Sequence, residues 1–379
     1  MLTSRQRVLT ALDHKEADRV PIDVGGGCST SISVEGYDRL KDFLHMPGKG
    51  EKLSELFRIA KLDENVLQFL GSDCRPIVLG PRANWKPPQS EPGTLVDEFG
   101  ITWKQIPYKS GFYWEAVGNP LAQASLEDLD AYPWPATEDP GFTLGLADEI
   151  KALYETDYAI VADSGYQSIW EPAYLMRGFG KLLTDMLRNP EIASKIMSKI
   201  LEINISITGQ FLDVVGPYIQ VIRTSDDLAT QENLMFPPEL YRKMLKPLQK
   251  KFFDFIKSKT KAKIFYHSCG NVAPVIEDLV ETGVDIINPV QVSALGDTAR
   301  LKSAFGEKVV FWGGIDTQEV LPRGSPEDVE VEVRHRIRDL APGGGFVLAA
   351  VHNIQPDVQP QNIIAMVNAA KKFGQYQVQ

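Results

Sequence analysis

The sequence predicts an α/β fold, a closed (β/α)8 TIM barrel of eight parallel strands, each followed by a helix. Short and almost continuously apolar runs end in polar or glycine residues, and helical patterns separate most of them. Strands of this kind are typical of a parallel sheet that is covered on both faces. The 379-residue chain is long enough for one large domain, so we expect residues 1–379 to form a single barrel. An open doubly wound sheet is the competing arrangement.

The elements can be assigned in order along the chain. An N-terminal amphipathic helix begins the chain, with Thr3 and Gln6 at capping-box spacing ahead of Val8. Further helical patterns cover residues 186–214, 238–259 and 326–341. Eight strands are predicted at residues 20–26, 74–80, 159–165, 219–227, 263–270, 285–291, 309–316 and 346–353.

Residues 81–135 interrupt the alternation of strands and helices. This segment is rich in proline, glycine and aromatic residues, and it contains two short alternating runs around "TLVDEFGITWKQI". We expect a β-hairpin excursion from a strand-to-helix loop near the barrel mouth. Its aromatic side chains are expected to form either a lid over the mouth or a small core of the excursion itself.

Composition limits the possible partners. A formal charge of -10 and a sequence pI near 5.2 leave no broad basic surface for nucleic acid or anionic lipid. Cys28, Cys74 and Cys269 are too few and too scattered for a disulfide framework. The N-terminal stretch carries charges throughout, and no uncharged apolar run approaches the ~20 residues needed to span a bilayer. We therefore expect a cytoplasmic protein that binds neither nucleic acid nor membrane.

The stretch "KIFYHSCGN" (residues 263–271) ends an apolar strand with a histidine and a cysteine. Side chains alternate along a strand, so His267 and Cys269 face one side and Ser268 the other. The pair is consistent with metal chelation, with a nucleophile and its base, or with two core residues. A catalytic zinc usually needs three protein ligands, so the metal interpretation requires a third from another strand.

Polar residues gather where the predicted strands end. In a barrel these ends meet at the C-terminal mouth, where barrel enzymes place their active sites. Simpler roles exist for some of them, since Asp226 or Asp227 is suited to capping the next helix and Asn353 to bonding loop backbone. The group comprises Asp163, Ser164, Asp226, Asp227, His267, Cys269, Asn288, Gln291, Asp316, His352 and Asn353.

Four segments in order resemble the uroporphyrinogen decarboxylase superfamily, which also contains corrinoid-linked methyltransferases. They are "SRQRVLTALDHKEADRVPIDVGG", "YHSCGNVAPVIEDLVETGVDIINPVQ", "VVFWGGIDTQEVLPRGSPEDV" and "GGGFVLAAVHNIQPDVQPQNIIAMVNA". The resemblance spans nearly the whole chain. It implies a (β/α)8 barrel that is often dimeric and has its active site at the C-terminal mouth.

Two differences between this sequence and members of the superfamily indicate which branch it resembles more. True uroporphyrinogen decarboxylases resemble one another in an arginine-bearing "RQAGRY" segment after the first strand, whereas this chain reads "GGGCSTSIS". A substrate with many carboxylates would be poorly neutralised there. The methyltransferase branch has an H-x-C pair of zinc ligands, matched here by His267 and Cys269. Its members that act on thiols have a further cysteine near the last strand, which this chain lacks.

A single thiolate leaves zinc a stronger Lewis acid, suited to polarising oxygen. The resemblance therefore favours a zinc-dependent methyltransferase, which is the methyltransferase component of an O-demethylase. It would move methyl from a small methoxy compound, for example an aromatic one, to a separate corrinoid protein. Alternatives are a porphyrin-pathway decarboxylase and a non-catalytic barrel that binds a small ligand or tetrapyrrole. We expect a homodimer. His267 and Cys269 are predicted to bind zinc, and Asp226 or His352 to complete the coordination. The predicted catalytic residues are His352, Asp226 and Tyr174. The predicted substrate-binding residues are Asp73, Ser225, Gln291 and Asn353.

Overall fold

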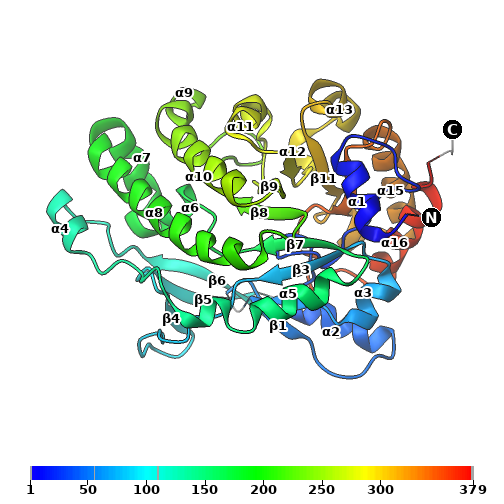
Figure 1. Cartoon of the computed structure of the whole chain (residues 1–379), viewed down its shortest axis with the longest axis horizontal. Coiled ribbons are helices and arrows are strands. Elements are labelled where there is room, and N and C mark those ends of the chain that lie inside the picture. Colours follow the sequence, from blue (N-terminus) through cyan, green and yellow to red (C-terminus); the bar gives the residue numbers. More distant parts are fainter. Residues whose placement is uncertain (1, 55, 109–110, 377–379) are drawn as a thin grey trace.

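The computed structural model describes residues 2–54, 56–108 and 111–376. Its main sheet is parallel and curled, with the strand order β12-β11-β10-β9-β8-β7-β3 (Figure 1). Each of these strands falls within one of the predicted apolar runs, which confirms seven of the eight. The strands are β3 (Cys74–Val78), β7 (Ala159–Asp163), β8 (Val221–Ser225), β9 (Lys263–His267), β10 (Ile286–Asn288), β11 (Val310–Ile315) and β12 (Phe346–Ala350).

The first predicted strand joins the two edges of this sheet without forming a regular strand. On the β12 side, Leu348 N donates to Pro21 O and Asp23 N donates to Leu348 O, both at 2.9 Å. On the β3 side, Asp73 N donates to Ile22 O at 2.8 Å. Proline has no amide hydrogen to add to a ladder, which helps to keep this segment irregular. The barrel prediction is confirmed, and the open doubly wound sheet is excluded.

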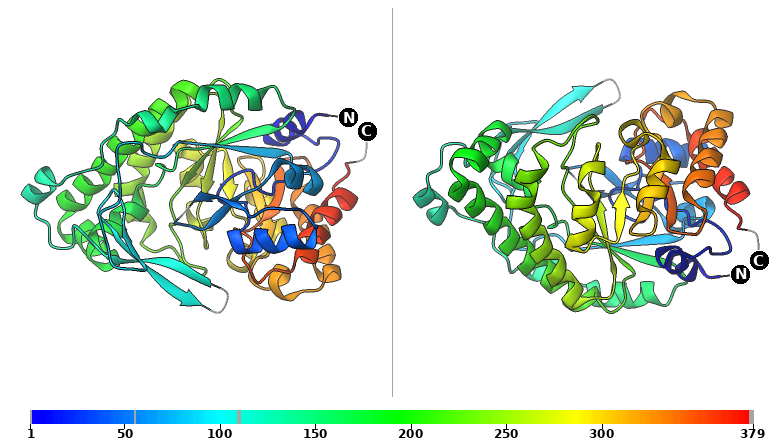
Figure 2. Two further views of the ribbon diagram at one scale, coloured as in Figure 1. Left: turned by 90° about the horizontal axis from the view of Figure 1, so that it is seen from below. Right: turned by 90° about the horizontal axis from the view of Figure 1, so that it is seen from above.

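Helices surround the sheet (Figures 1 and 2). The predicted N-terminal helix, with its capping box of Thr3 and Gln6, is confirmed, as is the helix that begins at Pro326. The helix predicted at residues 186–214 is divided between two helices in the structure. Its first residues belong to the end of α7 (Phe179–Arg188), and the others belong to α8 (Pro190–Val215). The helices are α1 (Ser4–Leu12), α2 (Val34–Phe43), α3 (Glu64–Leu70), α4 (Leu126–Ala131), α5 (Leu146–Tyr154), α6 (Trp170–Arg177), α7 (Phe179–Arg188), α8 (Pro190–Val215), α9 (Pro238–Leu240), α10 (Lys246–Lys259), α11 (Ile276–Thr282), α12 (Val292–Leu295), α13 (Thr298–Phe305), α14 (Val320–Arg323), α15 (Pro326–Leu340) and α16 (Pro360–Phe373).

Shorter helical turns complete these elements. The predicted 238–259 helix contains a π-helical segment between α9 and α10. The turns are η1 (Pro140–Thr143), η2 (Tyr241–Leu245) and η3 (Ala273–Val275).

The predicted excursion is a small antiparallel sheet of β4 (Thr94–Val96), β5 (Thr102–Tyr108) and β6 (Gly111–Gly118). Figure 2 shows its ribbon extending beside the barrel. Its aromatic residues divide between the two expected roles, because Trp103 is buried whereas Tyr113 is 51% exposed and lines a cavity near the mouth. A second hairpin, β1 (Glu51–Ser54) with β2 (Ile59–Lys61), was not predicted.

The barrel interior changes from apolar to polar along the strands. Its apolar core contains Val161, Val221, Phe265 and Ile286, and α1 contributes two side chains to the same cluster. Strand side chains alternate, so the positions two residues later also face inward. The apolar core of the barrel therefore supports a polar layer nearer the mouth, made by Asp163, Arg223, His267 and Asn288.

Candidate metal centre

Three potential metal ligands meet at the mouth of the barrel. His267 ends β9, Cys269 follows in the next loop, and His352 follows β12. One nitrogen or sulfur atom of each lies within 4.8 Å of the others. Cys269 Sγ is 3.6 Å from His267 Nε2, and the two imidazole rings have centroids 5.3 Å apart. The tertiary structure thus supplies a third donor for the predicted His267 and Cys269 pair.

Asn288 orients the His267 ring. His267 Nδ1 lies 2.5 Å from Asn288 Oδ1, while the amide group of Asn288 donates to Trp312 O at 2.9 Å. Because the amide nitrogen is engaged by that carbonyl, Asn288 Oδ1 accepts and His267 Nδ1 carries the proton. The lone pair of Nε2 then faces Cys269. Metal-binding histidines are commonly oriented by an outer hydrogen bond of this kind.

The loop after β9 fixes the cysteine. Cys269 N donates to Asp227 Oδ1 at 2.8 Å, and Gly270 N donates to Gln291 Oε1 at 2.7 Å. Gly270 has a φ of +88°, and a Cβ there would lie 2.4 Å from the carbonyl oxygen of Thr230. Only glycine allows both this conformation and this close approach.

Burial controls the charges of the three side chains. Burial, and then the nearby Arg223, lower the pKa of His267 to about 3. Burial and the neighbouring His267 lower the pKa of His352 to about 4. Burial, followed by Asp227 and Glu171, raises the pKa of the Cys269 thiol. Both imidazoles are therefore neutral near pH 7, as metal ligands must be, and the thiol would have to lose its proton on binding a metal.

The donor set fits zinc. Neutral imidazoles and one thiolate are ligands that zinc accepts, and three protein ligands leave a position open for a substrate or water. His267 lines the main cavity of the mouth, Cys269 lines a smaller one of about 310 Å³, and His352 borders both. The residues present could therefore hold a catalytic zinc ion.

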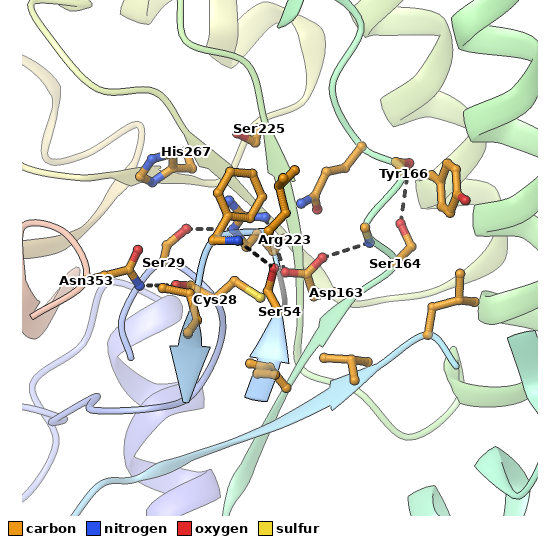
Figure 3. Close-up of a pocket in the computed structure, with 18 of the residues that line it drawn as sticks. Cys28, Ser29, Ser54, Asp163, Ser164, Tyr166, Arg223, Ser225, His267 and Asn353 are labelled. Carbon is orange, nitrogen blue, oxygen red and sulfur yellow. Dashed lines mark hydrogen bonds and ion pairs between the residues drawn. The ribbon is translucent and has the colours of Figure 1, made fainter. Parts of the chain in front are cut away.

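The main cavity, which His267 and His352 line, has a volume of about 590 Å³ and opens at the mouth. Figure 3 shows Arg223 within it, between Ser29 and Asp163. Arg223 Nε donates to Ser29 Oγ at 2.6 Å, and Nη1 lies 3.2 Å from Asp163 Oδ2. The unpredicted hairpin β1–β2 contributes Ser54 and Phe57 to the wall of the cavity.

Several residues with a predicted role line a cavity of the mouth. Ser225 and Asn353 border the main cavity, and Gln291 borders the smaller one beside Cys269. Asn353 Nδ2 also donates to Cys28 O, so the backbone-bonding role considered for this residue is present. Their roles in substrate binding remain predictions.

Asp226 has a different place from the one predicted. Its carboxylate accepts from the amides of Ile169, Trp170 and Glu171 at the start of α6 and does not line the main cavity. A carboxylate that accepts hydrogen bonds from the first amides of a helix stabilises that helix. Asp226 therefore has the capping role that its position in the sequence also indicated. The structure therefore does not support Asp226 as a catalytic residue or as the third ligand.

Tyr174 and Asp73 are not among the residues that line the main cavity. Tyr174 packs its ring against Trp170 and Phe179, with centroid distances of 5.5 Å in each case. Asp73 precedes β3 at the opposite end of the barrel, where it is fully buried and paired with Arg7 and Arg19. The predictions of catalysis by Tyr174 and substrate binding by Asp73 are not supported by these positions.

Sequence reasoning missed Arg223 and Glu171, which both line the main cavity. Arg223 lies inside β8 rather than at its end, and the two-residue spacing from the inward-facing Val221 would have indicated its direction. Glu171 lies in the first turn of α6. Burial, and then Asp227 and Asp226, raise the pKa of Glu171 to about 8. Only the fold brings this turn to the mouth.

The family model described as "Uroporphyrinogen decarboxylase (URO-D)" matches residues 122–373. The chain belongs to the uroporphyrinogen decarboxylase family. It is 23% identical over 292 residues to a uroporphyrinogen decarboxylase of Pseudoalteromonas translucida, covering 74% of this chain and 76% of that one. It is 27% identical over 197 residues to the methylcobamide:CoM methyltransferase MtbA of Methanosarcina mazei, covering 52% of each chain.

A solved structure shares the fold of this family member over almost its full length. The methyltransferase from Methanosarcina mazei aligns with a TM-score of 0.67 at 19% identity, covering 98% of this chain and 99% of that one. This likeness supports the barrel. In the described part of the chain, no helix has both the length and the apolar character required to cross a bilayer.

Proposed function

We propose that this family member is a zinc-dependent methyltransferase that takes methyl from a small methoxy compound and passes it to a separate corrinoid protein. The observation that carries the proposal is the convergence of His267, Cys269 and His352 beside the main cavity. Similarity to the methylcobamide:CoM methyltransferase supports methyl transfer as the reaction type. The homodimer expected from the family resemblance is part of the proposal.

The chemistry required is cleavage of a methyl–oxygen bond. The methyl group goes to the reduced cobalt of the partner, and the oxygen keeps the bonding electron pair and takes a proton. Zinc held by His267, Cys269 and His352 would supply Lewis acidity toward that oxygen. Asn288 keeps the His267 ring in the required tautomer, and the cavity walls would hold the donor beside the ligand cluster.

The main cavity does not suit the alternative decarboxylase reaction. Arg223 is the one arginine or lysine among its described lining residues, and Asp163 and Ser29 already engage two of its nitrogens. Four carboxyl groups also line the cavity, namely those of Glu98, Asp163, Glu171 and Asp227. A substrate with many carboxylates would meet repulsion here rather than neutralisation.

The test combines metal analysis with an assay of methyl transfer. Purified protein should contain stoichiometric zinc by mass spectrometry and should methylate an added Co(I) corrinoid, followed by its absorption spectrum, when a methoxyphenol is supplied. A metal-free parent protein with full activity would contradict the zinc mechanism. Decarboxylation of uroporphyrinogen with a kcat of about 1 per second or more would instead support the decarboxylase reaction.

A further inference from the structure

The carboxyl groups of the main cavity fall into two pairs with different surroundings. Glu98 accepts a hydrogen bond from Tyr166 Oη at 2.6 Å and lies 4.0 Å from Arg82. Asp163 pairs with Arg223 and also accepts from Gly165 N at 2.9 Å. Each of these two carboxylates therefore has a basic side chain that balances its charge.

Glu171 and Asp227 have no such partner. Among the described residues, neither makes an ion pair, and neither oxygen of Glu171 accepts or donates a hydrogen bond. Asp227 receives one hydrogen bond, from the backbone of Cys269 to Oδ1, which leaves Oδ2 without one. Both side chains line the cavity that reaches His267 and His352. Partly buried carboxyl groups without partners are costly unless a ligand satisfies them.

The chemistry of these groups restricts the donor. A carboxylate on the donor would be repelled by Asp227, and also by Glu171 where that group is ionised, while Arg223 is already engaged by Ser29 and Asp163. A cationic donor would share the cavity with the positively charged Arg223, which lies near enough to act on both Glu171 and Asp227. The ring of Tyr166 already has the guanidinium of Arg82 at 5.5 Å from its centroid. A hydroxyl group satisfies a carboxyl oxygen without adding charge.

We propose that the cavity selects an uncharged methyl donor that bears a hydroxyl group, held by Glu171 and Asp227, and excludes donors that carry a carboxylate. This inference rests on the proposed function for the identity of the bound molecule as a methyl donor. It goes beyond that function in assigning two specificity-determining residues and the charge of the substrate.

The test is a binding series on zinc-loaded protein without corrinoid, measured by isothermal titration calorimetry. Vanillamide, vanillate and vanillylamine share a ring with one hydroxyl and one methoxy group and differ in charge, and meta-methoxybenzamide lacks the hydroxyl. Vanillamide should bind about tenfold more tightly than vanillate and about tenfold more tightly than meta-methoxybenzamide. The parent protein alone therefore tests both parts of the inference.

Variants identify the residues responsible. Glu171→Gln and Asp227→Asn should each reduce the preference for the hydroxyl to about threefold or less, and Asp227→Asn should also reduce the discrimination against vanillate to about threefold or less. Glu191→Gln is the matched control, because Glu191 lies in the first turn of α8 and is exposed. It should leave all four dissociation constants unchanged.

Several results would overturn the inference. They are vanillate binding as tightly as vanillamide, vanillylamine binding more tightly than both, failure of vanillamide to bind, and unchanged preferences in both carboxyl variants. Methyl transfer is measured separately. If the binding order holds but no methyl reaches the corrinoid, the proposed function fails while the charge selection stands.

Discussion

The two ends of the barrel use the same kinds of charged residues in opposite ways. At the closed end, Asp73 accepts from Arg7 at 2.7 Å and from Arg19 at 2.8 Å, and it also receives the backbone amide of Ile22. At the mouth, Glu171 and Asp227 line an open cavity without an ion-pair partner among the described residues. Asp73 at the closed end therefore has charged partners, whereas Glu171 and Asp227 at the mouth are available to bind a ligand.

This difference suggests that the carboxylate at the closed end serves stability and that the two at the mouth serve ligand binding. A buried carboxylate that is fully paired is costly to disturb, because its partners would be left as uncompensated charges. A carboxyl group without partners stores unfavourable energy that a ligand can relieve. The two ends should therefore respond to mutation in different measurements.

The largest expected effect is at the closed end. Asp73→Asn should lower the free energy of unfolding by about 3–5 kcal/mol, because Arg7 and Arg19 lose a buried counter-charge. Urea denaturation measures this loss, and the zinc content of the folded fraction should not change. Asp18→Asn is the matched control, since Asp18 pairs with Arg7 but is 27% exposed, and its removal should cost ~1 kcal/mol. Equal losses in the two variants would contradict the special role of Asp73.

The second effect is at the mouth. Cys269→Ser should weaken zinc binding by at least about 100-fold, or ~2.7 kcal/mol, while the melting temperature of the metal-free protein stays close to that of the parent. Competition with a chelator gives the affinity, and calorimetry gives the melting temperature. Cys28→Ser is the control, because Cys28 lines the cavity but lies outside the ligand cluster. Zinc retained by Cys269→Ser, together with lower stability, would indicate a core role instead.

A third effect depends on pH. The folded protein raises the pKa of Glu171 from 4.5 to about 8, so the protonated form is favoured by folding. The parent should have its full stability below pH 4.5 with respect to this group and lose part of it as the pH rises toward and through 8. In metal-free protein, Glu171→Gln should therefore be more stable than the parent by ~2 kcal/mol at pH 9, with no such gain at pH 4.5.

Urea denaturation at both pH values checks this prediction. Glu191→Gln, at an exposed helix start, should show no pH-dependent gain. If Glu171→Gln has the same advantage over the parent at both pH values, then the ionisation of Glu171 does not oppose folding, and the proposed contrast between the two ends is weaker.

The smallest effect concerns the orientation of a ligand. Asn288→Ala removes the hydrogen bond that fixes the His267 ring and should weaken zinc binding about tenfold, or ~1.4 kcal/mol. Asn362→Ala also deletes a buried amide that donates to two backbone carbonyls, but it lies on α16 outside the mouth. That control should lose stability without losing zinc affinity. Equal zinc affinity in both variants would show that Asn288 has no orienting role.

The local elements of this protein follow from short-range patterns of residues. Apolar runs that end in polar residues located the strands, because parallel strands covered on both faces must be apolar along their length. The spacing of Thr3 and Gln6, and of Pro326 with the residues that follow, located two helix starts for reasons of local hydrogen bonding. Alternation along β9 predicted that His267 and Cys269 face one side, and these two residues do converge.

Contacts between distant segments, in contrast, set which strand ends meet and which polar side chains have partners. His352 follows the last strand and yet lies beside His267, because the sheet curls until β12 and β3 approach through the segment at Ile22. Asp226 accepts hydrogen bonds from the amides at the start of α6, whereas Asp227 lines the cavity, although the two are neighbours in sequence. Such differences arise from contacts between distant segments, which no local pattern of residues records.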